Sequence, residues 1–344
     1  MPILAPTFSL AIGGLRTSTD NPVAGPKRIL VERSMDIPAD AMQLHLMERA
    51  GIALGDDVII ALGHDGNETT VFTGNVVAVK PALIGVTIFA LGKMNALLNL
   101  FTSTTFENQT AGSIARDLIA QAGLSTGSVA EGPLLPRFAV DHRLSGFAHL
   151  KDLADRLGYD FYADRDGKIM FHGLGPAANL DVAIGGLPGQ VTGALSGGGG
   201  QSYAFGKHLL HAHADQQNAA WGAITVGGES PMSGQGDITA HWLTANDADY
   251  RGSAGAGSPA LLIRDAAARY KDLAERFAAG RLAVAAREAH QVSIAVLGQP
   301  QLDLGDPINV NEVSDDLLNG AGYIRALRHR FGDGIGFVTD IKIS

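Results

Sequence analysis

The chain has 344 residues, of which 46% are hydrophobic and 18% are charged, with 44 glycines, no cysteine and a formal net charge of -9. This length predicts two or three domains, and the many glycines favour short strands and turns over long helices. The acidic balance argues against general nucleic-acid binding, which needs a basic surface, and the lack of cysteine excludes disulfides, thiolate catalysis and cysteine-bound zinc.

The first third of the chain has the alternation of half-buried strands. Apolar residues alternate with others from Phe8 to Ile12 and from Arg28 to Ser34, and further apolar runs continue to about Leu100. The tetrapeptide His64-Asp65-Gly66-Asn67 has strong turn chemistry. We predict a first all-β domain over residues 1–103.

The middle of the chain changes character and predicts a small α+β domain over residues 104–176. Apolar residues at helical spacing predict one helix that ends near Gly123 and a second helix between Ser145, as N-cap, and Gly158. The turn around Asp166-Gly167 then predicts a hairpin between two apolar strands.

The last half of the chain divides into a glycine-rich stretch, a predicted helix and a C-terminal run of strands. Residues 173–257 are rich in glycine and alanine and predict mostly irregular loops, and Ser258-Pro259 predicts the start of a long helix over about 259–289. From Val292 to Ser344 the strand alternation returns, with turn glycines between the runs, and predicts an antiparallel meander. We assign residues 177–344 to a third domain with the helix inserted in it.

No apolar stretch approaches the roughly 20 uninterrupted residues of a membrane-spanning helix, and the N-terminal residues lack the positive charge that begins a signal peptide. We therefore expect a chain that is made and kept in a cytoplasm, with no membrane insertion of its own.

The C-terminal meander matches a segment of the first domain. Leu54-Gly55-Asp56, Gly74 and Gly85 precede apolar strands in the same order as Leu304-Gly305-Asp306, Gly322 and Gly336, and hairpin loops absorb the small differences in spacing. Any two β meanders could look alike, which is the alternative. A true repeat predicts two similar β-barrels per chain, so three chains around an axis would form a ring of six similar units.

Several segments together carry a resemblance to a known family. They are G-Q-P-Q-L-D-L-G-D from Gly298, G-Y-I-R-A-L-R-H-R-F from Gly322 and G-F-V-T-D-I-K-I from Gly336, with F-A-H-L-K-D-L-A-D-R-L-G-Y-D-F-Y-A-D-R-D-G-K-I-M-F, T-A-G-S-I-A-R-D-L-I-A-Q-A-G-L and V-F-T-G-N-V-V-A-V earlier. In their order they resemble the tail hub proteins of contractile injection systems, which include the phage late control D family and the hub half of VgrG.

The resemblance implies a structural baseplate hub, a homotrimer whose two barrels per chain form a pseudo-sixfold ring between the sixfold tail tube and the threefold central spike. The spike is expected to be a separate protein, because no spike domain follows Ser344. Other baseplate components would be partners, assembly would take place in the bacterial cytoplasm, and the hub would become part of a phage-tail-like particle. The structural and interface candidates are Leu54, Gly55, Asp56, Gly74, Gly85, Gly298, Pro300, Leu302, Gly305, Asp306, Gly322, Tyr323, His329, Phe331, Gly336 and Thr339.

Other features could indicate chemistry but have simpler interpretations. His208, His211 and His213 have a spacing at which imidazoles can share a cation, so a cation-binding module is one alternative. Asp164-Arg165-Asp166-Gly167 begins like a calcium loop but is explained by a hairpin turn. Acidic turns suggest a carbohydrate- or peptidoglycan-active enzyme as another alternative, although aspartate is common beside turn glycines. We predict no catalytic site, no metal and no cofactor; the acidic residues in question are Asp303, Asp306, Asp315 and Asp316.

Overall fold

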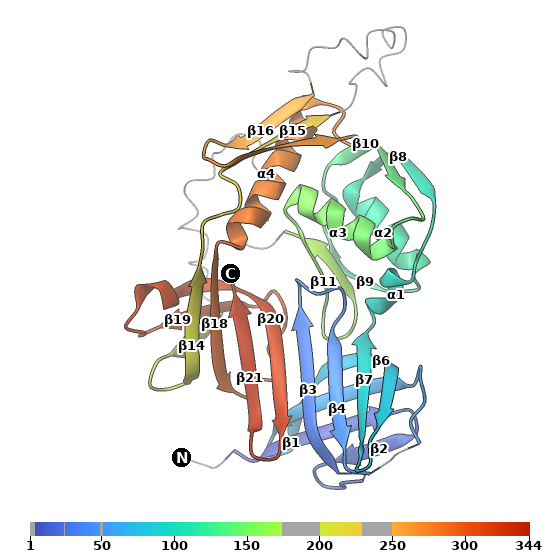
Figure 1. The fold of residues 1–344 in the computed structure, drawn as a ribbon, viewed down its shortest axis with the longest axis vertical. Helices are drawn as coiled ribbons and strands as arrows, with labels where there is room; N and C mark the ends of the chain where they lie inside the picture. Colours follow the sequence, from blue (N-terminus) through green and yellow to red (C-terminus); the bar gives the residue numbers. More distant parts are fainter. Residues whose placement is uncertain (1–3, 24, 49–50, 174–199, 229–249) are drawn as a thin grey trace.

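The computed structural model describes residues 4–23, 25–48, 51–173, 200–228 and 250–344, and the account below concerns these (Figure 1). The fold is mainly β with an α+β insertion, as the sequence predicts. None of the described helices has the length and apolarity to cross a membrane.

The first strands form what we call the N-terminal meander. Its strands are β1 (Pro6–Ile12), β2 (Leu15–Ser18), β3 (Pro26–Ser34), β4 (Ala41–Leu46), β5 (Asp57–His64), β6 (Asn67–Pro81) and β7 (Val86–Gly92). Inward-facing apolar residues alternate along them, as in β7, where Val86, Ile88 and Ala90 are buried. These residues share one core with the inner faces of β1 and β5, including Leu10 and Ile60.

The last strands form the C-terminal meander. They are β13 (Gln201–Ala204), β14 (Leu209–Gln216), β18 (His290–Leu297), β19 (Pro307–Asn311), β20 (Gly320–Gly332) and β21 (Gly336–Ile343), with the short 3-10 turn η5 (Asp316–Leu318). A second core collects their inward-facing apolar side chains, among them Ile294, Ile308 and Ile341.

The two meanders join edge to edge in one sheet. Its antiparallel strands β14-β18-β21-β20-β3-β4-β7-β6, which we call the main row, run from one side of the molecule to the other (Figure 1). The joining pair is β20 and β3, in register from Ala326 opposite Ser34 to Gly332 opposite Arg28. At the far end of the row β6 continues into β5, β1 and β2, whereas β19 and β13 branch from β20.

The repeat predicted from the sequence recurs in the strand register. The orders β3-β4-β7-β6-β5 and β14-β18-β21-β20-β19 match strand for strand. Each meander also has the same two register shifts, one at Lys27 and Leu210 and one at Val77 and Arg325. Such bulges bend a strand locally and increase its twist, so equal bulges give the two meanders equal bends.

The Leu-Gly-Asp turns complete the match. The N–H of Gly55 donates to the carbonyl of Val76, whose own N–H donates to the carbonyl of Asp56 (2.8 and 2.9 Å). In the same pattern the N–H of Gly305 donates to Ile324 O and the N–H of Ile324 to Asp306 O (2.8 and 3.0 Å). The two turn glycines have φ values of 87° and 84°, where a side chain is strained.

The middle of the chain forms a helix-rich unit above the main row (Figure 1). Its elements are α1 (Asn95–Leu98), β8 (Thr104–Thr110), α2 (Ala111–Gln121), β9 (Thr126–Val129), β10 (Leu134–Val140), α3 (Gly146–Leu157), β11 (Asp160–Ala163) and β12 (Ile169–His172). The predicted caps are confirmed: the Ser145 hydroxyl accepts from the N–H of Ala148, and Gly158 ends α3 with φ 72°. The predicted hairpin is β11 and β12.

A segment between β14 and β18 in sequence packs on this unit. It comprises β15 (Ala223–Gly228), β16 (Arg251–Gly255), β17 (Ala260–Asp265) and α4 (Lys271–Arg287). Side chains of α4, such as Phe277, share a core with α2 and α3. A Cβ on Gly280 of α4 would lie 2.3 Å from the carbonyl oxygen of Arg156, so the missing side chain permits the close approach of α3 and α4.

Two sequence predictions are corrected here. The helix predicted over 259–289 starts only at Lys271, because Ala260–Asp265 is the strand β17, in which Leu261 and Ile263 alternate toward the core and pair in parallel with β15. Irregular loops were predicted for 173–257, yet the described parts of that stretch contain four strands. Small residues let these strands pack closely: a Cβ on Gly252 of β16 would lie 2.0 Å from the backbone nitrogen of Glu275 in α4. The rest of the stretch lies outside the described residues.

Candidate assembly interface

The joint between β3 and β20 has an open face and a buried face. On the open face Arg328 Nη2 of β20 lies 2.9 Å from Glu32 Oε1 of β3, directly across the strand pair. Next to it, Arg330 Nη2 bonds Asp340 Oδ1 of β21 at 2.7 Å. Each of these partly exposed ion pairs contributes little to the free energy of unfolding. Their main effect is to favour the observed register of the strands.

The buried face of the joint is centred on Arg33, whose side chain is 2% exposed. Its guanidinium bonds Asp303 Oδ1 at 2.7 Å, Asp40 Oδ2 at 3.0 Å and the carbonyl of Ala163 at 3.1 Å. Arg165 of the β11–β12 turn bonds the other oxygen of Asp303 at 3.0 Å. One cluster therefore joins both meanders to the middle unit.

The two carboxylates of this cluster respond differently to burial. Burial raises the pKa of Asp40 to about 6, even though Arg33 acts to lower it. Burial also raises the pKa of Asp303, but Arg33 and Arg165 together outweigh that effect and leave its pKa below the usual value. Asp303 is therefore the carboxylate that stays ionised between the two arginines.

A second buried cluster surrounds Asp160, the first residue of β11. Its carboxylate accepts from Arg325 Nη1 at 2.8 Å and from Arg287 Nη1 at 3.0 Å. Arg325 occupies the bulge of β20 and reaches Asp36 in the β3–β4 turn as well, at 2.8 Å. The bulge turns this side chain out of the strand alternation and into the contact between the main row and the middle unit.

His329 lies in the buried face beside these clusters and is 1% exposed. Its Nδ1 is 3.0 Å from Thr339 Oγ1, and its Nε2 has no hydrogen-bond partner among the described residues. Burial lowers the pKa of His329 to about 3, with Arg33 and Arg165 adding to the effect. The neutral imidazole therefore packs in the core, where the opposing effect of Asp303 is too small to offset burial.

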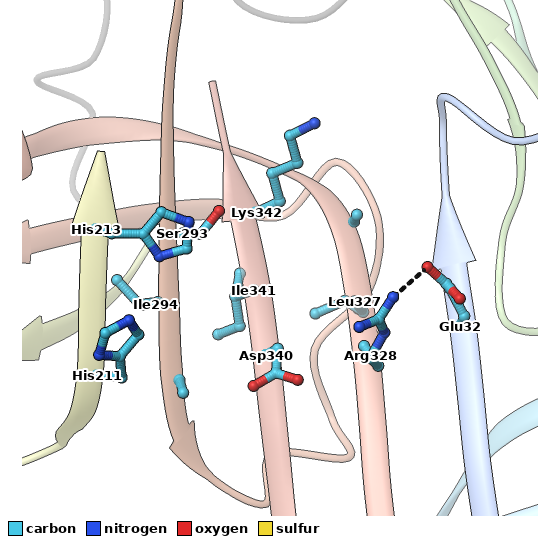
Figure 2. Close-up of a pocket in the computed structure, with 12 residues that line it drawn as sticks. Glu32, His211, His213, Ser293, Ile294, Leu327, Arg328, Asp340, Ile341 and Lys342 are labelled. Atoms are coloured by element: carbon cyan, nitrogen blue, oxygen red, sulfur yellow. Dashed lines mark hydrogen bonds and ion pairs between the residues drawn. The ribbon is translucent and has the colours of Figure 1, made fainter. Parts of the chain in front are cut away.

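The open face of the C-terminal meander carries a shallow pocket of about 320 Å³ across β14, β18, β21, β20 and β3 (Figure 2). His211 and His213 project onto it from β14, with ring centroids 5.5 Å apart. His208 lies elsewhere, with its Nδ1 accepting from the N–H of Ala204 at 3.2 Å. The three histidines do not converge, and no group of three His, Asp or Glu within the described ranges could hold a metal ion.

Most of the acidic residues that could have indicated chemistry have structural roles, whereas Asp316 is exposed at the start of η5. Asp164 Oδ1 accepts from the N–H groups of Asp166 and Lys168 and closes the hairpin turn. Asp306 Oδ2 accepts from the N–H of Asp303, just as Asp56 Oδ2 accepts from the N–H of Ala53 in the first meander (2.7 and 2.8 Å). Asp315 accepts from the N–H of Leu317 at 3.0 Å and begins the short turn η5.

The structure divides the candidate interface residues into buried and exposed sets. Leu54 is 69% exposed at its turn, while Gly298 leaves no room for a side chain, since a Cβ there would lie 2.0 Å from the ring of Phe337. Gly85 and Gly336 both begin a returning strand with φ values of 78° and 71°. The remaining buried or half-buried members hold the strands together within the chain: Pro300, Leu302, Tyr323, Phe331 and Thr339.

The buried clusters around Arg33 and Asp160 were not anticipated from the sequence. One signal was available for Arg33: it follows Ile29 and Val31 at the inward positions of its strand, where a charged residue needs a buried partner. Nothing in the sequence identified that partner, because Asp303 is far away in the chain.

Comparison with known proteins places this fold among phage tail proteins. The 43 kDa tail protein of prophage MuSo2 from Shewanella oneidensis is 16% identical, with a TM-score of 0.69 over 99% of this chain and 98% of its own. A tail protein from Neisseria meningitidis MC58 is 12% identical, with a TM-score of 0.71 over 98% and 96%.

A third solved structure comes from a secretion system. It is an E. coli component of the type VI secretion system, described as similar to the T4 bacteriophage tail proteins gp27 and gp5; it is 12% identical, with a TM-score of 0.54 over 97% of this chain and 75% of its own. At these identities the likeness shows the fold. No protein-family model and no curated protein sequence matches the chain.

Proposed function

We propose that this chain is a structural hub of a phage-tail-like particle, assembled as a homotrimer. Its two similar meanders would give three chains six similar units around an axis. Such a ring fits a sixfold tail tube on one side and a threefold central spike on the other. The spike would be a separate protein, and the remaining baseplate components would contact the hub from outside.

The observation that carries this proposal is the register match between the meanders. Equal strand order, two shared bulges and equal Leu-Gly-Asp turns give two units of similar backbone shape within one chain. Two such units per chain are what a threefold assembly needs in order to present sixfold contacts. The tail-protein fold of the solved structures supports the same function.

The proposal is structural rather than enzymatic. Three of the four acidic residues considered above are held in ion pairs or turns: Asp303 by two arginines, and Asp306 and Asp315 by backbone N–H groups. We also propose the domain division predicted from the sequence, with barrels at residues 1–103 and 177–344 around the unit at 104–176.

The test is the mass and shape of the purified full chain. Sedimentation or native mass measurement should give a trimer, alone or once tube and spike proteins are added, and electron micrographs should show a ring with six similar lobes. A chain that stays monomeric with both partners present contradicts the hub. Release of fragments from purified peptidoglycan would instead support an enzyme.

A further inference from the structure

Two edges of the main row have no strand partner in the part of the chain that the structure describes. β14 pairs with β18 on one side only. Residues 78–81 of β6 pair with β7 on one side only, because β5 follows β6 no further than Asn75. The two edges lie at opposite ends of the row (Figure 1). Such edges present open N–H and C=O groups that favour pairing with another strand.

The repeat shows what each open edge corresponds to inside the chain. Counted from the shared bulges, residues 78–81 of β6 correspond to 326–329 of β20, and β14 corresponds to β3. β20 and β3 are the strands that join the meanders. Each open edge is therefore the counterpart of an edge that is already paired within the chain.

We infer that β6 of one copy pairs antiparallel with β14 of a second copy, in the register that β20 and β3 adopt within a chain. The inference rests on the proposed trimer and specifies how its copies meet. The transferred register sets Lys80 opposite Asp215 of the second copy, with Ala78 opposite Gln217. Because different edges meet, the contact is head-to-tail, and it closes into a ring when the rotation permits.

Charge supports this register. Within the chain Arg328 bonds Glu32 directly across the joint, at 2.9 Å. The transferred counterpart is Lys80 opposite Asp215, which is again a basic residue facing an acidic one. Both are exposed in the single chain: Lys80 Nζ lies 4.6 Å from the ring centroid of Phe89, and the Asp215 side chain is 76% exposed.

The pair would also make the contact selective. Opposite charges facing each other across antiparallel strands are favourable, and a lysine on an open edge discourages pairing with unrelated strands. A register shifted by two residues sets Lys80 opposite His213 or Gln217 and loses the ion pair. The contact between copies is limited to four residue pairs, because the β6–β7 hairpin ends at Pro81. The equivalent β20–β21 hairpin is longer and extends to Gly332.

Disulfide cross-linking of the full chain tests the register, and the absence of cysteine gives a clean background. In Ala78→Cys/Gln217→Cys the two thiols face each other between copies while Lys80 and Asp215 are kept. Mild oxidation is expected to link chains covalently, up to a closed trimer. In Leu30→Cys/Arg330→Cys the thiols face each other within one chain, so this variant is the positive control for the chemistry.

The matched negative control is Ala78→Cys/His213→Cys. It keeps the thiols on the same face but moves one by four residues, about 13 Å along the strand, which is beyond the reach of a disulfide. Links between chains in this control and none in Ala78→Cys/Gln217→Cys would overturn the inferred register.

Charge reversal tests the ion pair. Lys80→Glu or Asp215→Lys places like charges opposite each other at every contact of the ring, so we expect roughly a tenfold rise in the concentration needed for half assembly. Lys80→Glu/Asp215→Lys should restore assembly. Arg116→Glu, which reverses an exposed charge on α2, should leave assembly unchanged.

The outcomes separate this contact from the hub proposal. Trimers that form equally well with either reversal, and that do not cross-link through residues 78 and 217, contradict the pairing of β6 with β14 but leave a trimeric hub standing. A chain that stays monomeric at every concentration, even with tube and spike proteins present, contradicts both.

Discussion

The N-terminal and C-terminal meanders share a backbone pattern but use it differently. At the bulge shared by β6 and β20, Val77 is 41% exposed on the outside of the molecule, whereas Arg325 is 8% exposed and bonds Asp160 and Asp36. The bulge residue therefore makes no polar contact in the N-terminal meander, where it is Val77. In the C-terminal meander it is Arg325, whose ion pairs hold the main row to the middle unit. Backbone register has been kept between the meanders, while side chains have adapted to what each meander contacts.

A second difference lies in the strands that cover the meanders. β1 pairs antiparallel with β5, but β13 pairs in parallel with β19. The meanders also differ just before the Leu-Gly-Asp turn. The C-terminal meander has Asp303 there, which bonds Arg33, whereas the equivalent residue of the N-terminal meander is Ala53. The C-terminal meander thus supplies the carboxylate, Asp303, that Arg33 and Arg165 share, and the variants below test that asymmetry.

Asp303→Ala is expected to have the largest effect. It leaves Arg33 with Asp40 as its only carboxylate in a buried site, and removal of one partner from a buried ion pair costs about 3–5 kcal/mol. Urea unfolding measures the loss. Glu32→Ala removes the exposed pair with Arg328 and is the control, with an expected cost of at most about 1 kcal/mol. Equal costs for the two variants would contradict the role given to Asp303.

Gly74→Ala and Gly322→Ala compare equivalent positions of the two meanders. A Cβ at Gly74 would lie 2.2 Å from the carbonyl oxygen of Leu91, while one at Gly322 would lie 2.6 Å from the side chain of Ile343 and 2.9 Å from the carbonyl oxygen of Ser344. A side chain can move more easily than a paired strand. We expect losses of about 3 and about 1–2 kcal/mol respectively in the free energy of unfolding. The reverse order would indicate that β21 is the more rigid neighbour.

His329→Gln should make the free energy of unfolding less sensitive to acid. The residue equivalent to His329 in the N-terminal meander is Pro81, which does not titrate. The unfolded chain binds a proton at His329 near pH 6.5, but the folded chain does so only near 3. The neutral imidazole therefore contributes stability above pH 6.5 that is lost as the pH falls. Between pH 6.5 and 5 the native chain should lose about 2 kcal/mol relative to the variant.

Asp40→Asn supplies a control of opposite sign in the same pH titration. The pKa of Asp40 is raised from 3.8 to about 6, so its contribution is fully present below 3.8 and is lost as the pH rises through 6. The native chain should therefore lose stability relative to this variant as the pH rises from 4 to 6. Parallel pH curves for the native chain and both variants would show that neither group titrates as its burial requires.

Gly55→Ala and Gly336→Ala should have the smallest effects, and these should be similar. Each glycine has a positive φ, 87° and 71°, with open space where a Cβ would sit. Only the backbone strain of a left-handed residue remains, about 1 kcal/mol. Thermal unfolding measures both. A much larger loss at Gly336 in the assembled particle than in the free chain would indicate that this turn contacts a partner.

Much of the fold was predictable because its signals are local. The caps at Ser145 and Gly158, the Asp166-Gly167 hairpin and the alternation in the C-terminal strands depend on neighbouring residues, and the structure confirms them. The helix predicted from 259 failed for a nonlocal reason. Residues 260–265 become a strand because β15 offers them a partner, and pairing outweighs the N-cap signal of Ser258-Pro259.

The repeat itself was visible in the sequence, since turn glycines are required wherever the backbone takes a positive φ. Its exact alignment was not. Gly85 and Gly336 match as the glycines that begin the returning strands. Counted from the shared bulges, however, Gly85 corresponds to Val338, because the β20–β21 hairpin is longer than the β6–β7 hairpin. Only strand pairing fixes a register, and a longer hairpin moves its turn glycine without disturbing the pairs below it.

By itself the sequence determined a mainly β chain with a helix-rich insertion and two related meanders, because periodicity and turn chemistry act over a few residues. The tertiary structure alone decided that β3 and β20 join the meanders, that Arg33 meets Asp303, and that two edges of the main row have no strand partner among the described residues. These features depend on contacts between residues far apart in the chain. Such contacts produce no local or periodic pattern in a single sequence, so they could not be predicted from it.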